Sequence, residues 1–127
     1  MTRSAISTSG APAAIGPYSQ GIIAGGFLFS AGQAAMDPAT GALVEGGIEP
    51  ETERVMANLT AVLDAAGTSW ADVVKTTIFL VDMADFGTDK AIYGRFIGDP
   101  PPARTTVAVA ALPKGARVEI ELVARLG

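Results

Sequence analysis

Three consecutive prolines at residues 100–102 constrain this chain more than any other feature. Proline fixes its own φ, lacks the backbone N–H that a helix needs, and biases the preceding residue towards extended backbone. The run therefore predicts the end of a helix before it and the rigid start of a strand after it, at Arg104. A Leu-Pro-Lys-Gly turn at 112–115 leads to the alternating segment 117–122, which predicts a further strand. We expect these last two strands to pair, so that Glu119 could lie near Arg104.

The segments before the prolines alternate between strand and helix patterns. Apolar runs at 22–24 and 27–29 flank Gly25-Gly26, which is typical of a hairpin with a two-residue turn. The other expected elements are a short edge strand in the first dozen residues, turns at 37–41 and 45–47, a helix of about four turns from Pro50 to a left-handed cap at Gly67, a strand at 73–81, and a second helix from Phe86 to Ile97 that stops at Gly98. The main elements follow the order β-β-α-β-α-β-β.

This order predicts an α+β fold in one domain, residues 1–127, with a mixed sheet of about six strands. Two helices can cover only one face of such a sheet, so the other face must meet water or another subunit. Apolar residues make up 49% of the chain and charged residues only 17%, which is little charge for a small soluble monomer. We therefore expect a homo-oligomer.

The ionisable residues exclude several classes of function. The formal charge is −4 and the nine Lys and Arg residues are scattered, so we expect no nucleic-acid partner. Without cysteine or histidine there is no thiolate nucleophile, no zinc–thiolate site, no Ser-His-Asp triad and no imidazole ligand. Asp82 and Asp85 are typical of a turn and a helix cap rather than a calcium loop, and Gly25-Gly26 joins two strands, unlike a phosphate loop. The sequence therefore predicts neither a metal nor a cofactor, and leaves acid–base chemistry to carboxylates, tyrosine, lysine or ordered water.

Nothing in the sequence predicts a membrane location. Residues 1–4 are not followed by the continuous apolar core of a signal peptide, and no run has the length of a membrane span. We expect a cytoplasmic protein with no membrane partner.

Four polar side chains are candidates for chemistry. Arg104 lies at the start of a strand that the preceding prolines hold rigidly. Its guanidinium has five donors in a fixed fork, which suits a small carboxylate. Glu119 alternates with apolar residues and shares a strand face with Glu121, Thr106 shares one with Arg104, and Tyr18 follows a rigid Gly-Pro turn. Each also has an ordinary interpretation, as a surface arginine, a solvated strand face or a half-buried tyrosine.

Taken together, several segments resemble the RidA (YjgF-type) reactive-intermediate deaminase family. The resemblance covers nearly the whole chain in order, and its pairing of Pro-Ala-Arg with Leu-Pro-Lys is specific. The matching residues are Ala14-Ile15-Gly16-Pro17-Tyr18-Ser19-Gln20-Gly21, Gly32-Gln33, Asn58-Leu59, Val74-Lys75-Thr76-Thr77-Ile78-Phe79-Leu80, Pro102-Ala103-Arg104, Leu112-Pro113-Lys114-Gly115 and Val118-Glu119-Ile120-Glu121.

The resemblance implies a chorismate-mutase-like fold assembled as a homotrimeric barrel, with three clefts between adjacent subunits. The implied reaction is hydrolysis of 2-imino acids, the tautomers of enamines such as 2-aminoacrylate, to 2-keto acids and ammonia. In the implied site Arg104 binds the substrate carboxylate, Glu119 positions the attacking water and Tyr18 lines the cleft. The other substrate-binding residues implied by the match are Ala31, Gly32, Phe86, Lys90 and Thr106.

Three positions depart from the family pattern. Ala31 stands where the deaminating branch usually has serine, and the neighbouring Ser30 would point to the opposite strand face. Lys90 falls where asparagine is common, and Thr106 falls where many members have cysteine. Because Arg104 and Glu119 are retained, we expect an active or nearly active site with an altered substrate.

Two further interpretations remain open. The departures are also compatible with a non-enzymatic ligand sensor or chaperone-like protein that uses the same clefts. RNA cleavage and translation inhibition have been attributed to family members, but the acidic charge and the missing histidine oppose them here.

Overall fold

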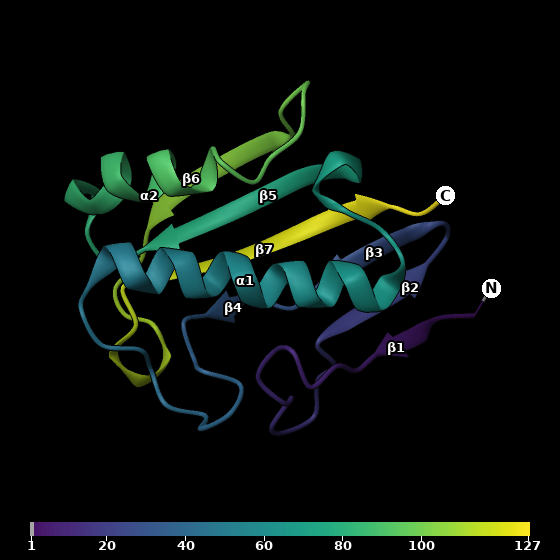
Figure 1. Cartoon of the computed structure of the whole chain (residues 1–127), viewed down its shortest axis with the longest axis horizontal. Coiled ribbons are helices and arrows are strands. Elements are labelled where there is room, and N and C mark those ends of the chain that lie inside the picture. Colours follow the sequence, from purple (N-terminus) through teal and green to yellow (C-terminus); the bar gives the residue numbers. More distant parts are fainter. Residues whose placement is uncertain (1) are drawn as a thin grey trace.

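A computed structural model describes residues 2–127 as two helices packed on a seven-stranded mixed sheet (Figure 1). The strands are β1 (Ser4–Ile6), β2 (Gly21–Ala24), β3 (Phe27–Ser30), β4 (Gln33–Ala34), β5 (Val73–Leu80), β6 (Ala103–Ala108) and β7 (Val118–Arg125). The α-helices are α1 (Ile48–Ala66) and α2 (Phe86–Tyr93), and three short 3₁₀ turns occupy Trp70–Asp72, Met83–Asp85 and Pro113–Gly115. The strand order is β1-β2-β3-β7-β5-β6, and β4 pairs with β7. The α+β class and the large mixed sheet expected from the sequence are confirmed.

The hairpin and the long helix form where the sequence patterns place them. Gly25 and Gly26 connect β2 and β3 with φ values of 60° and 84°, a conformation that side chains with a Cβ rarely adopt. Helix α1 ends at Gly67 in the left-handed conformation, as expected, but it begins two residues before Pro50. No helix in the described residues combines the length and hydropathy needed to cross a membrane.

Helix α2 is shorter than the sequence pattern suggested. It ends at Tyr93 rather than continuing to Ile97. The chain turns at Gly94, a poor helix former, and the Phe96 ring then packs at 6.0 Å from the Trp70 ring. Phe96, whose spacing suggested a longer helix, is therefore apolar because it packs against Trp70.

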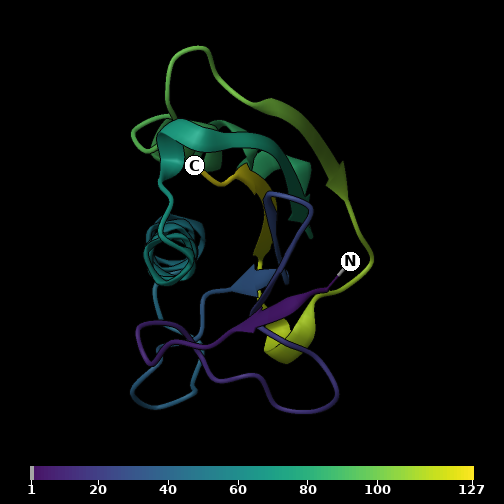
Figure 2. The ribbon, with the colours of Figure 1, turned by 90° about the vertical axis from the view of Figure 1, so that its right-hand side faces the viewer.

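Both helices cover the same face of the sheet, and Figure 2 shows α1 end-on beside the curved strands. In β7 the residues Val118, Ile120 and Leu122 are buried under this helical layer, with exposed fractions of 0–2%, while the alternating residues face the other way. On that open face Phe27 and Phe29 are 38% and 46% exposed. The sequence expectation of a sheet covered on one face only is confirmed.

The last two strands do not pair with each other, contrary to the expectation from the sequence. Strand β6 pairs in parallel with β5, where Arg104 lies opposite Thr76, and β7 pairs antiparallel with the other edge of β5. The reason is the β5–α2–β6 crossover: α2 carries the chain back over the sheet, so β6 lies parallel beside β5 at the sheet edge. Strand β7 then takes the remaining side of β5.

Candidate functional site

Three of the residues singled out from the sequence, Phe86, Lys90 and Arg104, gather where α2 meets the edge strand β6, and Tyr93 of α2 joins them. We call Phe86, Lys90, Tyr93 and Arg104 the arginine cluster. The guanidinium carbon of Arg104 lies 5.2 Å from the centre of the Phe86 ring and 5.8 Å from that of the Tyr93 ring. Lys90 Nζ lies 5.5 Å from the same Phe86 centre. These are cation–π distances, so aromatic faces hold the guanidinium in place while it stays exposed.

A buried polar layer lies beneath the arginine cluster. Asp89 has no exposed surface, and Thr52 Oγ1 of α1 donates a hydrogen bond of 3.1 Å to its Oδ1. The Tyr93 hydroxyl is 2.8 Å from Thr76 Oγ1, which fixes the ring that supports Arg104. Burial raises the pKa of Asp89 from 3.8 to about 6, and the Thr52 hydrogen bond and the Arg104 charge only partly oppose this. Sequence reasoning missed Asp89, because nothing in its neighbours indicates that α1 covers it.

Thr106 lies two residues beyond Arg104 on the same face of β6, as expected from strand alternation. Its Oγ1 is buried, and within residues 2–127 it has no hydrogen-bond partner. The hydroxyl is therefore a spare polar group beside the arginine cluster.

A second group of predicted residues surrounds a separate cavity of about 450 Å³, which we call the glutamate pocket. Glu119 of β7, Tyr18 and Gly32 all line it. A Cβ placed on Gly32 would lie 2.5 Å from Glu119 Oε2, so only glycine lets the carboxylate sit against the backbone here. The remaining lining residues are Pro12, Ala13, Ile15, Gln33, Ala34, Met36, Pro38, Gly41, Pro113 and Lys114.

The carboxyl group of Glu119 is a weakened acid. Burial, and secondarily the negative charge of Glu121 on the same strand face, raise the pKa of Glu119 above its ordinary value. A raised pKa makes its carboxylate a better proton acceptor, which suits activation of a water molecule. Glu121 can raise the pKa of Glu119 because the two side chains lie on the same strand face, as the sequence alternation predicted.

Two turns bring further groups to the glutamate pocket. The Tyr18 backbone N–H donates to the Gly16 carbonyl at 2.9 Å, so the Gly-Pro turn directs a side chain that is 54% exposed. Lys114 adopts a φ of 57°, unusual for a residue with a side chain, and its Nζ donates to the Gly41 carbonyl at 3.0 Å. This contact joins the 37–41 turn to the 113–115 turn along the pocket wall.

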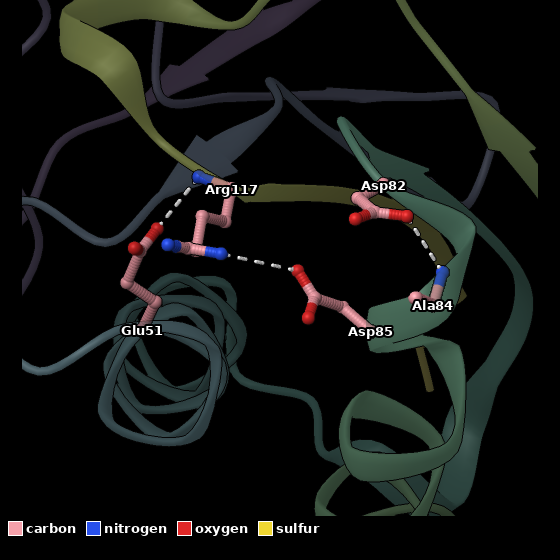
Figure 3. A network of polar contacts seen from close by, with 5 residues as sticks. All are labelled: Glu51, Asp82, Ala84, Asp85 and Arg117. Carbon is pink, nitrogen blue, oxygen red and sulfur yellow. Dashed lines mark hydrogen bonds and ion pairs between the residues drawn. The ribbon is translucent and has the colours of Figure 1, made fainter.

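A polar network fixes the entry to β7 (Figure 3). Glu51 of α1 is 3% exposed, and its Oε1 accepts a hydrogen bond of 2.8 Å from the backbone N–H of Arg117, two residues before Glu119. Arg117 Nη1 lies 3.7 Å from Asp85 Oδ2. Asp82 Oδ1 accepts a hydrogen bond from the Ala84 N–H at 2.9 Å, which confirms its predicted capping role. The network ties α1, the start of α2 and the start of β7 together.

Ala31 lies in neither group, since the lining of the glutamate pocket includes Gly32 but not its predecessor. Ala31 donates its backbone N–H to the Gln20 carbonyl at 3.0 Å. The neighbouring Ser30 uses its hydroxyl in the sheet, where Oγ accepts the Leu122 N–H at 2.9 Å. Sequence reasoning also missed β4, whose two residues hold Gly32 beside Glu119 by pairing with β7.

Arg104 and Glu119 lie on opposite faces of the sheet, so one chain does not bring them together. Arg104 is opposite Thr76, which is buried under α2, and Thr76 is in turn opposite Leu122 on the helical face. Glu119 is opposite Phe79 and alternates with this buried series. The expectation that the two side chains lie near each other is wrong within a single chain.

Comparisons with known proteins identify the relatives of this chain. The family model described as "Endoribonuclease L-PSP" matches residues 8–126. A RutC family protein from Synechocystis is 52% identical, covering 99% of this chain and 98% of its own length. A protein from Rattus norvegicus named 2-iminobutanoate/2-iminopropanoate deaminase is 48% identical, covering 100% of this chain and 93% of its own length.

Solved structures agree with this relationship. The crystal structure of YyfA, a Rid family protein from Yersinia pestis, superposes with a TM-score of 0.96 at 48% identity, covering 98% of this chain and 100% of that one. The resemblance to RidA proteins noted from the sequence is therefore confirmed. The chain belongs to the endoribonuclease L-PSP family, which includes the RidA (YjgF-type) proteins.

Proposed function

We propose that this protein hydrolyses 2-imino acids, and the enamines in equilibrium with them, to 2-keto acids and ammonia at clefts shared by neighbouring subunits of a homotrimer. One observation carries the proposal: a cationic anchor and a carboxylate-lined pocket lie on opposite faces of one sheet, so a single chain does not offer both to one substrate. Relatives named 2-iminobutanoate/2-iminopropanoate deaminase support this reaction.

In the proposed cleft, Arg104 binds the carboxylate of the substrate. Its guanidinium is exposed, and the rings of Phe86 and Tyr93 hold it from one side. A guanidinium binds a carboxylate through two parallel hydrogen bonds, and charge-assisted bonds of this kind contribute about 1.5–3 kcal/mol. This contact fixes the position of the C=N carbon relative to the pocket of the neighbouring subunit.

Glu119 then acts as the base that activates water. Its carboxylate accepts a proton from a water molecule as the water oxygen attacks the C=N carbon of the protonated imine. The resulting tetrahedral carbinolamine has an amino group, which takes up the proton from Glu119 and leaves as ammonia. The carbinolamine hydroxyl then gives its proton back to the Glu119 carboxylate as the carbon–oxygen double bond forms. The elevated pKa of Glu119 makes its carboxylate a stronger base towards the attacking water.

A protonated imine is itself electrophilic, so the site has mainly to orient substrate and water. Positioning of this kind can supply a large part of a rate enhancement, because reactants held in place need no further encounter. The tyrosine at position 18 is placed to line the glutamate pocket beside the reacting groups.

A homotrimer would complete the site and cover the open sheet face. The residues exposed there include Phe27, Phe29 and Val107, at 38%, 46% and 39%. Apolar side chains of this size are usually covered by a partner when they share one face, and closed cyclic assemblies are the common solution. Light scattering should give three times the 12.9 kDa mass of the chain.

The test is an assay coupled to a pyridoxal-phosphate dehydratase that releases 2-aminoacrylate or 2-iminobutanoate. The purified protein should accelerate keto-acid release, and Arg104→Ala and Glu119→Gln should each remove most of that acceleration. Arg95→Ala and Glu53→Gln are matched controls, because both residues are exposed and lie outside the two groups described above. Keto-acid release at the background rate with the wild-type protein would overturn the proposal for these substrates.

The same preparation separates the alternatives. A keto acid that binds in an Arg104-dependent way, without turnover of either imine, would indicate a ligand-binding protein. RNA cleavage that persists through further purification and is lost in Glu119→Gln would indicate the activity in the family name.

A further inference from the structure

The Phe86 ring has two cations beside it rather than one. Arg104 and Lys90 lie 5.2 Å and 5.5 Å from its centre, and they come from different elements, β6 and α2. Since both distances are measured to the same point, the two positive groups cannot be farther apart than their sum. Like charges at such a separation repel each other. Their proximity therefore favours an anion between or above them.

The two cations also lie on one side of α2. Phe86, Lys90 and Tyr93 occupy positions i, i+4 and i+7 of the helix, which places them on one stripe of its surface. Arg104 reaches over the two aromatic members of this stripe, at its start and its end, with Lys90 between them. Both cationic side chains are exposed, so a dissolved ligand can reach them.

No carboxylate in residues 2–127 forms an ion pair with either member of this pair. The ion pairs found between residues 2 and 127 use Arg117 and Arg125, and neither Lys90 nor Arg104 takes part in one. The charge of Asp89 acts on Arg104, but Asp89 is fully buried and directs Oδ1 to Thr52. Its charge lowers the local potential, but it cannot replace an external anion that contacts both cations.

We propose that Lys90 and Arg104 together select 2-imino acids that carry a second carboxylate, one cation binding each acidic group. This inference rests on the function proposed above, because it assigns the substrate class of the same cleft. Hydrolysis then follows the same balance: an imino-dicarboxylate and water give a keto-dicarboxylate and ammonia. Lys90 would act on binding of the side-chain carboxylate, and the reacting carbon would still meet Glu119 of the neighbouring subunit.

The test compares two keto acids of equal length, 2-oxoglutarate and 2-oxopentanoate, which differ only in the terminal carboxylate. Titration calorimetry on the full-length protein at low ionic strength should show about tenfold tighter binding of 2-oxoglutarate, the fold-change of one additional charge-assisted contact. The preference should shrink at high salt, because the cations are exposed. Lys90→Met should bring the ratio of the two affinities close to one. Arg95→Met removes the same charge from an exposed residue just beyond α2 and should keep the ratio.

The possible results separate this inference from the proposed function. Equal affinities in the wild-type protein, with both lost in Arg104→Ala, would overturn the selection of dicarboxylates and leave the imine-binding cleft in place. A preference that persists in Lys90→Met would also overturn the role of Lys90. Binding of neither acid would contradict both proposals.

Discussion

At the scale of single residues, burial decides the chemistry of the acidic groups. Asp89 and Glu119 are both held in surroundings that favour their protonated forms, but for different uses. Glu119 lies against the backbone of Gly32 at the edge of a cavity, where a base can meet water. Asp89 is closed off under α1 and serves no ligand directly. The cost of Asp89 should therefore appear in stability rather than in chemistry.

We predict that Asp89 makes the protein less stable as the pH rises. Its pKa is about 6 in the folded protein against 3.8 ordinarily, so between these values the folded state binds more protons than the unfolded chain. The free energy of unfolding should fall by about 1–3 kcal/mol across this interval and stay lower above it. Urea unfolding of the wild type and Asp89→Asn from pH 4 to 8, at one protein concentration, measures the difference. Asp64→Asn, an exposed change on α1, is the control, and parallel pH profiles for wild type and Asp89→Asn would contradict the prediction.

At the scale of elements, the site depends on how two segments are anchored. The β5–α2–β6 crossover places Arg104 over the rings of α2. Helix α1 holds Arg117, the residue directly before β7, through Glu51. Among the hydrogen bonds of residues 2–127, the one from the Arg117 N–H to Glu51 Oε1 joins α1 to the start of β7. The Glu51 side chain that accepts it is buried. Removing this acceptor leaves a partly buried N–H donor unpaired.

Glu51→Ala should therefore lower the free energy of unfolding by about 1–2 kcal/mol, the contribution of a partly buried hydrogen bond to a carboxylate. Glu51→Gln keeps an oxygen acceptor and should recover most of this loss. Glu53→Ala, an exposed change in the same helix, should stay within about 0.5 kcal/mol of the wild type. Chemical unfolding at a fixed protein concentration measures all three. A Glu51→Ala protein as stable as the Glu53→Ala protein would show that the hydrogen bond contributes nothing.

At the scale of the whole molecule, the separation of Arg104 and Glu119 makes assembly a condition of the proposed activity. The sheet itself lies between the two side chains, and no side-chain motion moves a residue through a paired strand. The exposed apolar face on the Glu119 side offers the surface on which a second subunit could bring its own arginine.

Mixing two inactive variants tests this arrangement. If a site takes Arg104 from one subunit and Glu119 from the next, trimers reassembled from equal amounts of Arg104→Ala and Glu119→Gln should regain about a quarter of wild-type activity, since random assembly completes that share of the clefts. The keto-acid assay measures the mixture before and after unfolding and refolding together. Activity no higher than that of the separate variants, in a mixture shown to have exchanged subunits, would rule out a shared site.

Local patterns in the sequence were enough to locate the hairpin, the two helices and the α+β class, and to single out Arg104, Glu119 and Tyr18 as candidates, because turns, caps and alternation depend on near neighbours. They also carried the resemblance to the RidA family. The tertiary structure alone decided that β5 lies between β6 and β7, that β4 holds Gly32 against Glu119, and that Asp89 is buried beneath the arginine cluster. These features depend on contacts between distant segments, which leave no periodic trace in the chain. The same contacts determine that Arg104 and Glu119 face away from each other, because the sheet between them is built from strands far apart in sequence.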